Sequence, residues 1–385
     1  MTRLKQLLNN NILLAFALST GVQQANAQVN QQGDVTVYTA RRTDTGVVDY
    51  VNAKAMPLPQ NSAPFDAVQS TVRALLTAQG ATASAGSSDG AAGSGIESPL
   101  FLGAPAAPRA DGNGRIEPQE WGTANLPFST ARADLSSTTN TMYPYRASGK
   151  LYFTDGASSY FCSASLIKRG VVVTAAHCVA KFGQSRYYTN FRFVPGYRNG
   201  SAPFGTWTAA SVTVKTSYFN GTDPCSTYGV VCQNDVAVIK LSSQAGTYPG
   251  TQTGWYCYGW DGYGFVNNTT HISQIGYPVC LDNGQLMERN DAQGIKNVPQ
   301  TNNTTYGSLM CGGSSGGPLA VNYGIRPTLT ATGSGTGAVS NTVVGVTSWG
   351  YTNSAVKQQG ASPFTSGNIV VLVNAVCSGG PAWCI

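Results

Sequence analysis

Short apolar segments, separated by Gly, Pro and Asn, recur along the chain from residue 143 onward. Segments 151–153, 161–167 and 171–173 have the length of β-strands, and turn-forming residues lie between them. The pattern does not alternate helices with strands. The pattern predicts an all-β fold of two antiparallel, six-stranded-type β-barrels, which about 240 residues can fill.

Two stretches depart from this pattern. Near the C-terminus, Ile369, Leu372, Val373 and Val376 recur at helical spacing, and Ser366 is a plausible N-cap. We expect a closing helix whose apolar face packs on a barrel. Near the N-terminus, 35–38 and 47–51 are strand candidates, and apolar residues between 65 and 76 have helical spacing that ends before Gly80.

The first 27 residues have the three parts of an export signal. Arg3 and Lys5 form a basic head, 12–18 are apolar, and Ala25-Asn26-Ala27 resembles a cleavage site. The apolar part is too short to span a bilayer as a helix, and no later segment approaches the ~20 apolar residues that a membrane helix needs. We expect a secreted or periplasmic protein with no membrane partner.

An Ala/Ser/Gly-rich stretch over 80–95 reads as a linker, because it offers little apolar surface to bury. We therefore divide the chain into a signal peptide at 1–27, a propeptide at 28–130 and a catalytic domain at 131–385. The alternative is an accessory N-terminal module that stays attached. A secreted protein that begins near Gln28 would favour that alternative.

Candidate chemistry centres on the turn Cys311-Gly312-Gly313-Ser314-Ser315-Gly316-Gly317-Pro318. A serine hydroxyl becomes a good nucleophile only when a base removes its proton, and its tetrahedral product needs nearby N–H donors. The glycines let the chain turn tightly, so that the amides of Gly313 and Ser315 can form an oxyanion hole. Gly-rich turns are also common as ordinary loops, so the turn makes Ser315 a candidate nucleophile only together with a suitable base and acid.

A base and an acid occupy suitable positions upstream. His177, one of two histidines, follows the apolar run 171–173 within Thr-Ala-Ala-His-Cys, and Asp235 precedes the apolar run 236–239. A buried carboxylate requires a partner, and the N–H of His177 is the natural one. The other histidine, His271, lies beside an Asn/Thr loop and is expected to be structural or solvated.

These motifs resemble those of the chymotrypsin/trypsin-like serine endopeptidases over residues 140–385. In that superfamily TAAHC, an Asp before a buried strand and G-x-S-G-G-P carry the triad in the order found here. The resemblance implies a catalytic cleft between the two barrels, with His177 and Asp235 from the first and Ser315 from the second. It also implies that Ser348, Trp349 and Gly350 bind the substrate backbone.

Two departures from the trypsin pattern bear on activation and specificity. Ser314 stands where trypsins have an Asp that pairs with a new N-terminal amine, so the chain resembles bacterial V8-like members more closely. Leu309 stands where trypsins have the Asp that binds Lys or Arg. A pocket with Leu309 at its floor and Gly350 at its wall is expected to accept an apolar side chain.

Nine cysteines in an exported chain favour disulfides over metal binding. The superfamily has a bridge at the positions of Cys162 and Cys178, and sequence proximity favours two others, Cys225–Cys232 and Cys377–Cys384. Three cysteines remain: Cys257, Cys280 and Cys311. We favour Cys280–Cys311, because that bridge would stiffen the nucleophile turn, and this leaves one thiol over.

Composition and charge give no indication of a nucleic-acid partner. Charged residues make up only 10% of the chain and the formal net charge is +6, which we interpret as a solubilising excess and not as a nucleic-acid site. Segment 109–120 resembles part of an EF-hand, but Arg109 occupies the first ligand position and would repel calcium. We expect a monomer that acts on proteins or peptides and needs no cofactor or metal.

Two other classes of function remain open. An inactive, protease-like binding protein would share the fold, although such proteins typically lack a triad residue. An esterase would share the chemistry, although α/β-hydrolases order their triad Ser, acid, His. The natural substrate and the site of maturation cannot be read from the residues.

Overall fold

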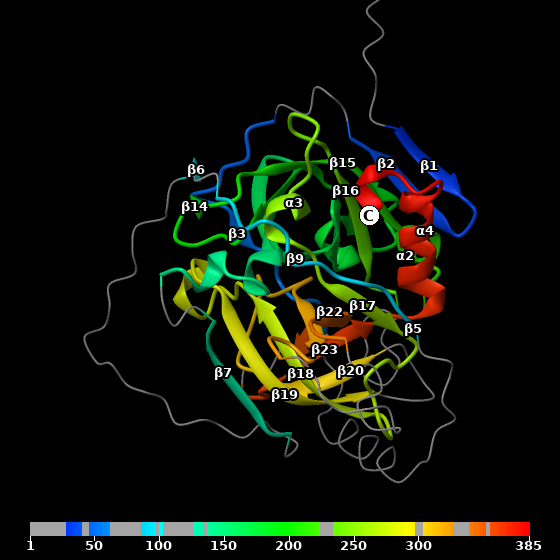
Figure 1. Ribbon diagram of the computed structural model, residues 1–385. Helices are drawn as coiled ribbons and strands as arrows, with labels where there is room; N and C mark the ends of the chain where they lie inside the picture. Colours follow the sequence, from blue (N-terminus) through cyan, green and yellow to red (C-terminus); the bar gives the residue numbers. More distant parts are fainter. Residues whose placement is uncertain are drawn as a thin grey trace, which may run out of the picture.

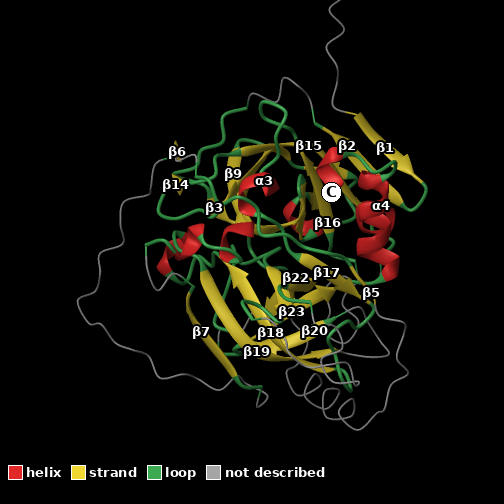
Figure 2. Cartoon of the chain, in the orientation of Figure 1, coloured by secondary structure: helices red, strands yellow, loops and turns green. Residues whose placement is uncertain are grey.

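The computed structural model describes residues 28–40, 46–61, 86–97, 100–102, 126–133, 137–223, 234–296, 303–325, 339–351 and 355–385. Strands dominate this part of the chain, and its helices are few and short (Figure 2). The signal segment, the helical spacing at 65–76, the EF-hand-like loop and Cys225 with Cys232 lie outside the described residues.

Six antiparallel strands close the first barrel in the order β15-β13-β8-β9-β10-β16, and β15 pairs back onto β16. These strands are β8 (Ser148–Asp155), β9 (Ser158–Lys168), β10 (Val171–Thr174), β13 (Thr189–Pro195), β15 (Trp207–Lys215) and β16 (Ala237–Leu241). The predicted apolar segments lie in β8, β9 and β10. Their side chains fill the barrel, and Leu166, Val172 and Ile239 are fully buried.

A second closed barrel follows, with the strand order β21-β18-β19-β20-β23-β22 and a β21–β22 pairing that closes it. Its strands are β18 (Thr269–Gly276), β19 (Glu288–Lys296), β20 (Thr304–Gly307), β21 (Pro318–Val321), β22 (Thr342–Tyr351) and β23 (Gln358–Pro363). In Figure 1 the first barrel is the upper, mainly green group and the second the lower, yellow to orange group. The predicted fold of two six-stranded barrels is confirmed.

The remaining strands and the α-helices lie outside the two sets of six barrel strands. The remaining strands are β1 (Gln28–Gln32), β2 (Val35–Thr39), β3 (Lys54–Ala55), β4 (Gln60–Asn61), β5 (Gly86–Ser87), β6 (Leu100–Phe101), β7 (Phe128–Arg132), β11 (Ala180–Lys181), β12 (Arg186–Tyr187), β14 (Ser201–Ala202) and β17 (Cys257–Trp260). The α-helices are α2 (Thr216–Asn220), α3 (Gly250–Thr253) and α4 (Val371–Cys377). No helix in the described ranges is long and apolar enough to cross a membrane.

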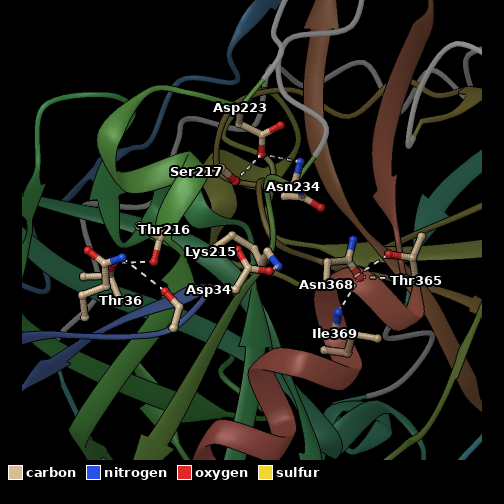
Figure 3. A network of polar contacts seen from close by, with 12 residues as sticks. Asp34, Thr36, Lys215, Thr216, Ser217, Asp223, Asn234, Thr365, Asn368 and Ile369 are labelled. Atoms are coloured by element: carbon tan, nitrogen blue, oxygen red, sulfur yellow. Dashed lines mark hydrogen bonds and ion pairs between the residues drawn. The ribbon is translucent and has the colours of Figure 1, made fainter.

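The N-terminal strand β2 extends the sheet of the first barrel by pairing with β15. Lys215 forms an ion pair with Asp34, and the hydroxyls of Thr36 and Thr216 lie 3.1 Å apart (Figure 3). Val35 is buried, so this strand adds apolar contact as well as backbone hydrogen bonds. The strand predicted at 35–38 is confirmed.

The strand predicted at 47–51 is wrong, because residues 46–53 form bends and extended coil. Asp49 is the cause. Its Oδ1 accepts hydrogen bonds from the backbone N–H groups of Val51 and Asn52, at 3.1 and 2.9 Å. Such a local Asx turn competes with a sheet ladder for the same donors.

The closing helix begins one residue earlier than predicted. Thr365, and not Ser366, is the N-cap: its hydroxyl accepts from the N–H of Asn368 at 3.1 Å, and Asn368 Oδ1 accepts from the N–H of Thr365 at 2.7 Å. Figure 3 shows this reciprocal pair, which satisfies two donors at the helix start. After a π-helical turn over Ser366–Val370, α4 buries Leu372 and Val373 beside β16 of the first barrel (Figure 1).

Candidate active site

His177 lies just after the end of β10, a strand of the first barrel. The chain enters a short 3-10 turn, Ala176–Cys178, and the His177 side chain is buried there. The predicted disulfide Cys162–Cys178 ties this turn to β9. Strand and disulfide together hold the imidazole in one position.

Asp235 reaches His177 because β16, which begins two residues later, runs antiparallel to β10 with Thr174 opposite Ala237. Its Oδ1 accepts the backbone N–H of His177 at 2.8 Å, and its Oδ2 lies 2.7 Å from His177 Nδ1. The hydroxyl of Ser348, from the second barrel, donates to the same Oδ2 at 2.6 Å. Three hydrogen bonds, from two residues, satisfy the carboxylate of Asp235, which is only 1% exposed as a residue.

The contact of Ser348 with Asp235 was missing from the sequence analysis, which assigned Ser348 to substrate binding. A serine in a buried strand carries no local signal for such a contact. It depends on β22 of the second barrel reaching Asp235, which precedes β16 of the first. The contact therefore links the acid of one barrel to a strand of the other.

The Ser315 turn is tight, as its glycines predict. Gly313 and Gly316 have φ values of +93° and +74°, which only glycine adopts readily. A Cβ on Gly316 would lie 2.0 Å from Thr174 Oγ1. Glycine here lets the nucleophile turn pack directly on the chain that leads to His177.

Ser163 of β9 forms hydrogen bonds to the same turn, a contact that the sequence analysis did not predict. Its backbone N–H donates to Ser315 O at 2.8 Å, and its hydroxyl donates to Gly313 O, also at 2.8 Å. The Ser163 hydroxyl in turn accepts the N–H of Tyr277 at 2.9 Å. The first barrel thus fixes the carbonyls on both sides of Ser314.

Ser315 Oγ and His177 Nε2 are both fully buried and have no hydrogen-bond partner among the described residues. They lie at the same barrel junction but are not hydrogen-bonded to each other in this structure. Such catalytic hydrogen bonds are often long or misaligned before substrate binds. The missing bond does not remove either group as a candidate.

The predicted oxyanion donor Gly313 has a partner. Its N–H donates to the backbone carbonyl of Met56 at 3.0 Å. Met56 belongs to the N-terminal region and was not expected at the site. Ser314, at the position where trypsins carry Asp, donates its hydroxyl to Cys311 O at 2.7 Å and so stays within the turn.

Two of the four predicted substrate-binding residues, Leu309 and Gly350, border a cavity of about 330 Å³. Leu309, Met310 and Gly350 line it, together with Lys357 and Leu58. Trp349 is different: its side chain is 1% exposed and donates through Nε1 to Asn303 Oδ1 at 3.1 Å. The Trp349 ring is thus buried in the second barrel, and Trp349 does not line this cavity.

Cysteines and the second histidine agree with the remaining expectations. Disulfides join Cys280 to Cys311 and Cys377 to Cys384, as predicted. Cys257 is buried and has no disulfide partner in the described part of the chain. His271 is exposed on β18, opposite Gln293.

Two closed antiparallel barrels, with a His–Asp pair on one and a Gly-rich serine turn on the other, define the class of chymotrypsin-like serine proteases. The sequence model of the Trypsin family matches residues 136–368 of this chain. The chain belongs to the trypsin family.

Two curated relatives cover part of the chain. The extracellular metalloprotease of Bacillus subtilis (strain 168) is 29% identical over 199 residues, which are 50% of this chain and 56% of that protein. The chain therefore spans little more than half the length of that relative. Trypsin beta of Drosophila erecta is 28% identical over 233 residues, 56% of this chain and 77% of that protein.

Solved structures to which the chain is similar include two proteases. Protease Anisep from Arthrobacter nicotinovorans has a TM-score of 0.48 and 26% identity, covering 60% of this chain and 94% of its own. A thermostable serine protease, AL20, from an extremophilic microorganism has a TM-score of 0.47 and 23% identity, covering 58% and 93%.

The name of the Bacillus relative raises the question of a metal. Among the described residues, Cys162, His177 and Cys178 form a group whose ligand atoms lie within 4.8 Å of one another. The two cysteines are joined in a disulfide and offer no thiolates. This donor set does not fit a metal ion.

Proposed function

We propose that the protein is an exported serine endopeptidase in which Ser315, His177 and Asp235 form a catalytic triad. The hydrogen bond of 2.7 Å between His177 Nδ1 and the buried Asp235 carboxylate carries the proposal. It lies at the junction where the Ser315 turn packs on the first barrel. Membership of the trypsin family supports the same reading.

In the proposed reaction, Ser315 Oγ attacks the carbonyl carbon of a peptide bond while His177 Nε2 accepts its proton. The C–N bond then breaks as His177 donates that proton to the leaving amine, which leaves an acyl-enzyme. Water, deprotonated by His177, hydrolyses the ester. Asp235 keeps the proton of the neutral imidazole on Nδ1 and stabilises the imidazolium, while the amides of Gly313 and Ser315 bind the oxyanion.

The cavity beside Leu309 and Gly350 supports a preference for apolar residues on the acyl side of the cleaved bond. Lys357 in the same lining favours a second candidate, an acidic side chain. A peptide-library digest separates the two. We expect cleavage after apolar residues; cleavage confined to sites after Glu or Asp would select the alternative, and cleavage only after Lys or Arg would contradict both.

The domain division is part of the proposal: signal peptide at 1–27, propeptide at 28–130 and protease at 131–385, acting as a monomer on proteins or peptides without cofactor, nucleic acid or membrane. The family match, which begins at residue 136, supports the start of the catalytic domain. Because Ser314 is engaged within its own turn, activity should not depend on an N-terminal amine. Acetylation of the mature N-terminus is expected to leave activity intact.

Fluorophosphonate labelling mapped by mass spectrometry tests the function. A fluorophosphonate reacts with an activated serine and releases fluoride, so we expect a single adduct on Ser315, absent from Ser315→Ala and strongly slowed in His177→Ala. An inactive binding protein would not be labelled at Ser315. A labelled protein that cleaves ester substrates but no peptide would favour an esterase.

A further inference from the structure

The N-terminal segment 54–61 crosses from one barrel to the other at the candidate active site. Its β3 end pairs in parallel with β9, with Lys54 opposite Tyr160 and Ala55 opposite Phe161. Its β4 end pairs in parallel with β22, with Gln60 opposite Gly350. Sequence alone gave no sign of this, since Met-Pro-Leu-Pro reads as an ordinary loop.

Backbone contacts place this segment on the proposed oxyanion hole. The N–H of Met56 donates to Phe161 O at 2.8 Å, and the carbonyl of Met56 accepts the N–H of Gly313 at 3.0 Å. The fit around Gly312 is close, because a Cβ there would lie 3.1 Å from Met56 O. The N–H of Gly313, which is proposed to stabilise the oxyanion, is therefore already hydrogen-bonded to this segment.

The other end of the segment covers the strand and the pocket that a substrate would use. The N–H of Gly350 donates to Pro59 O at 3.1 Å. Leu58 is 5% exposed, contacts Gly350 and borders the cavity that Leu309 lines. A peptide that adds to an edge strand needs these same backbone and side-chain positions.

We propose that residues 54–61 are a built-in inhibitor of the protease, seated in the substrate cleft until the N-terminal region is removed. This inference rests on the proposed function. Ser315 Oγ and His177 Nε2, the two groups proposed to react with substrate, are both fully buried while the segment is in place. It also gives the proposed propeptide a mechanism, which is direct blockage of the cleft.

The geometry explains why the inhibitor is not cleaved as a substrate. In a productive peptide, one residue supplies both the carbonyl under attack and the side chain in the adjoining pocket. Here the carbonyl at Gly313 belongs to Met56, whereas the side chain at the cavity belongs to Leu58. Pro57 and Pro59 also restrict the backbone, which lowers the entropy lost on docking.

Labelling of the full chain by a fluorophosphonate tests the inhibitor directly. The variant Met56→Pro/Leu58→Gly loses the N–H that bonds Phe161 and the side chain at the cavity. A tethered segment acts at a high effective concentration, so weakening it should raise the labelling rate of Ser315 by about tenfold or more. The matched control Val47→Gly changes an N-terminal residue that is 89% exposed, and should label like the wild type.

A synthetic peptide of residues 52–61 provides the second measurement, which does not depend on how well the variant folds. Added to the double variant or to N-terminally processed enzyme, it should restore slow labelling, and the same peptide with Gly at position 58 should not. Equal labelling rates for wild type and double variant, with no effect of the peptide, would overturn the inhibitor and leave the serine protease intact. No labelling of Ser315 in any form, together with no peptide hydrolysis, would overturn both.

Discussion

The interiors of the two barrels are built from different kinds of side chain. The first is filled mainly by apolar and aromatic groups, including the fully buried Leu151, Leu166 and Phe153. The second encloses a polar network in which Gln274 Nε2 donates to Thr347 Oγ1 at 2.9 Å and to Gln359 Oε1 at 2.7 Å. One interior is held mainly by packing and the other also by directional bonds.

The polar network of the second barrel continues to the loop that carries Leu309. Ser308 Oγ donates to Gln274 Oε1 at 2.9 Å, and Gln359 Nε2 donates to Met310 O at 2.8 Å. The first barrel instead presents His177 and Asp235 from strand ends fixed by apolar packing. The comparison indicates that the proposed acid–base pair depends on a packed core, while the shape of the cavity beside Leu309 depends on buried hydrogen bonds.

The largest expected effect comes from the acid of the first barrel. Asp235→Asn should lower kcat by about 10⁴, because an amide cannot hold the imidazole in the right tautomer or stabilise its charged form. Asp223→Asn is the matched control: it too is a buried carboxyl, and burial raises its pKa. Steady-state kinetics of both variants check this, and equal losses would show that buried charge in general, and not the His177 contact, matters.

Removing apolar volume from the first barrel should cost stability without changing specificity. Leu166→Ala leaves a cavity in a fully packed core, at a cost of about 2–5 kcal/mol in the free energy of unfolding. The exposed Val47→Ala should cost less than about 0.5 kcal/mol. Urea unfolding measures the loss of stability in both variants. A changed pattern of cleaved peptides in folded Leu166→Ala would show that packing of the first barrel also affects specificity, and would contradict this comparison.

Breaking the polar network of the second barrel should change specificity more than the acid–base chemistry. Gln274→Leu leaves the Ser308 hydroxyl, Thr347 and Gln359 short of partners, which costs about 1–3 kcal/mol of stability. We expect a raised KM and a broader choice of side chain, with reactivity toward a small fluorophosphonate largely kept. The exposed Gln293→Leu, in the same barrel, should behave like the wild type.

Lys150 is a buried lysine of the first barrel, and the effect expected from replacing it depends on pH. Its Nζ donates to Gly284 O at 3.0 Å and lies 3.8 Å from the centre of the Phe161 ring. Burial lowers its pKa well below the ordinary value of 10.5. The folded protein therefore holds this amine with fewer protons than the unfolded chain does.

The sign of the resulting pH dependence follows from that difference. As pH falls below 10.5, the unfolded chain takes up a proton that the folded protein does not, so the wild type loses stability by up to about 1.4 kcal/mol per pH unit until the folded pKa is reached. Lys150→Met lacks this loss. The free energies of unfolding of the wild type and of Lys150→Met, measured between pH 7 and 10, should converge toward high pH. A difference that stays constant over this range would contradict the lowered pKa of Lys150.

Much of the fold could be predicted from sequence because its signals are local. Apolar strand-length runs predicted the barrels and helical spacing predicted α4, while cysteine positions together with the superfamily resemblance predicted three bridges that the structure contains. The placement of His177 and Asp235 followed because each adjoins a recognisable buried strand. The strand expected at 47–51 failed for an equally local reason, the Asx turn of Asp49.

The contacts that sequence could not predict all join residues distant along the chain. Ser163 beneath the nucleophile turn, Ser348 on Asp235 and Met56 on Gly313 are each ordinary residues in their own segments. Their roles arise only when the two barrels and the N-terminal region meet. Tertiary geometry creates such contacts, and neither periodicity nor composition encodes them.

The central claim is that groups from the two barrels work as one catalytic unit, and a double-mutant cycle tests it most directly. We would measure kcat for peptide hydrolysis by N-terminally processed wild type, Ser315→Ala, His177→Ala and the double variant. If the two residues form one unit, the double variant should be no more than about twofold slower than either single variant. Losses that multiply in the double variant would show independent contributions and contradict the account.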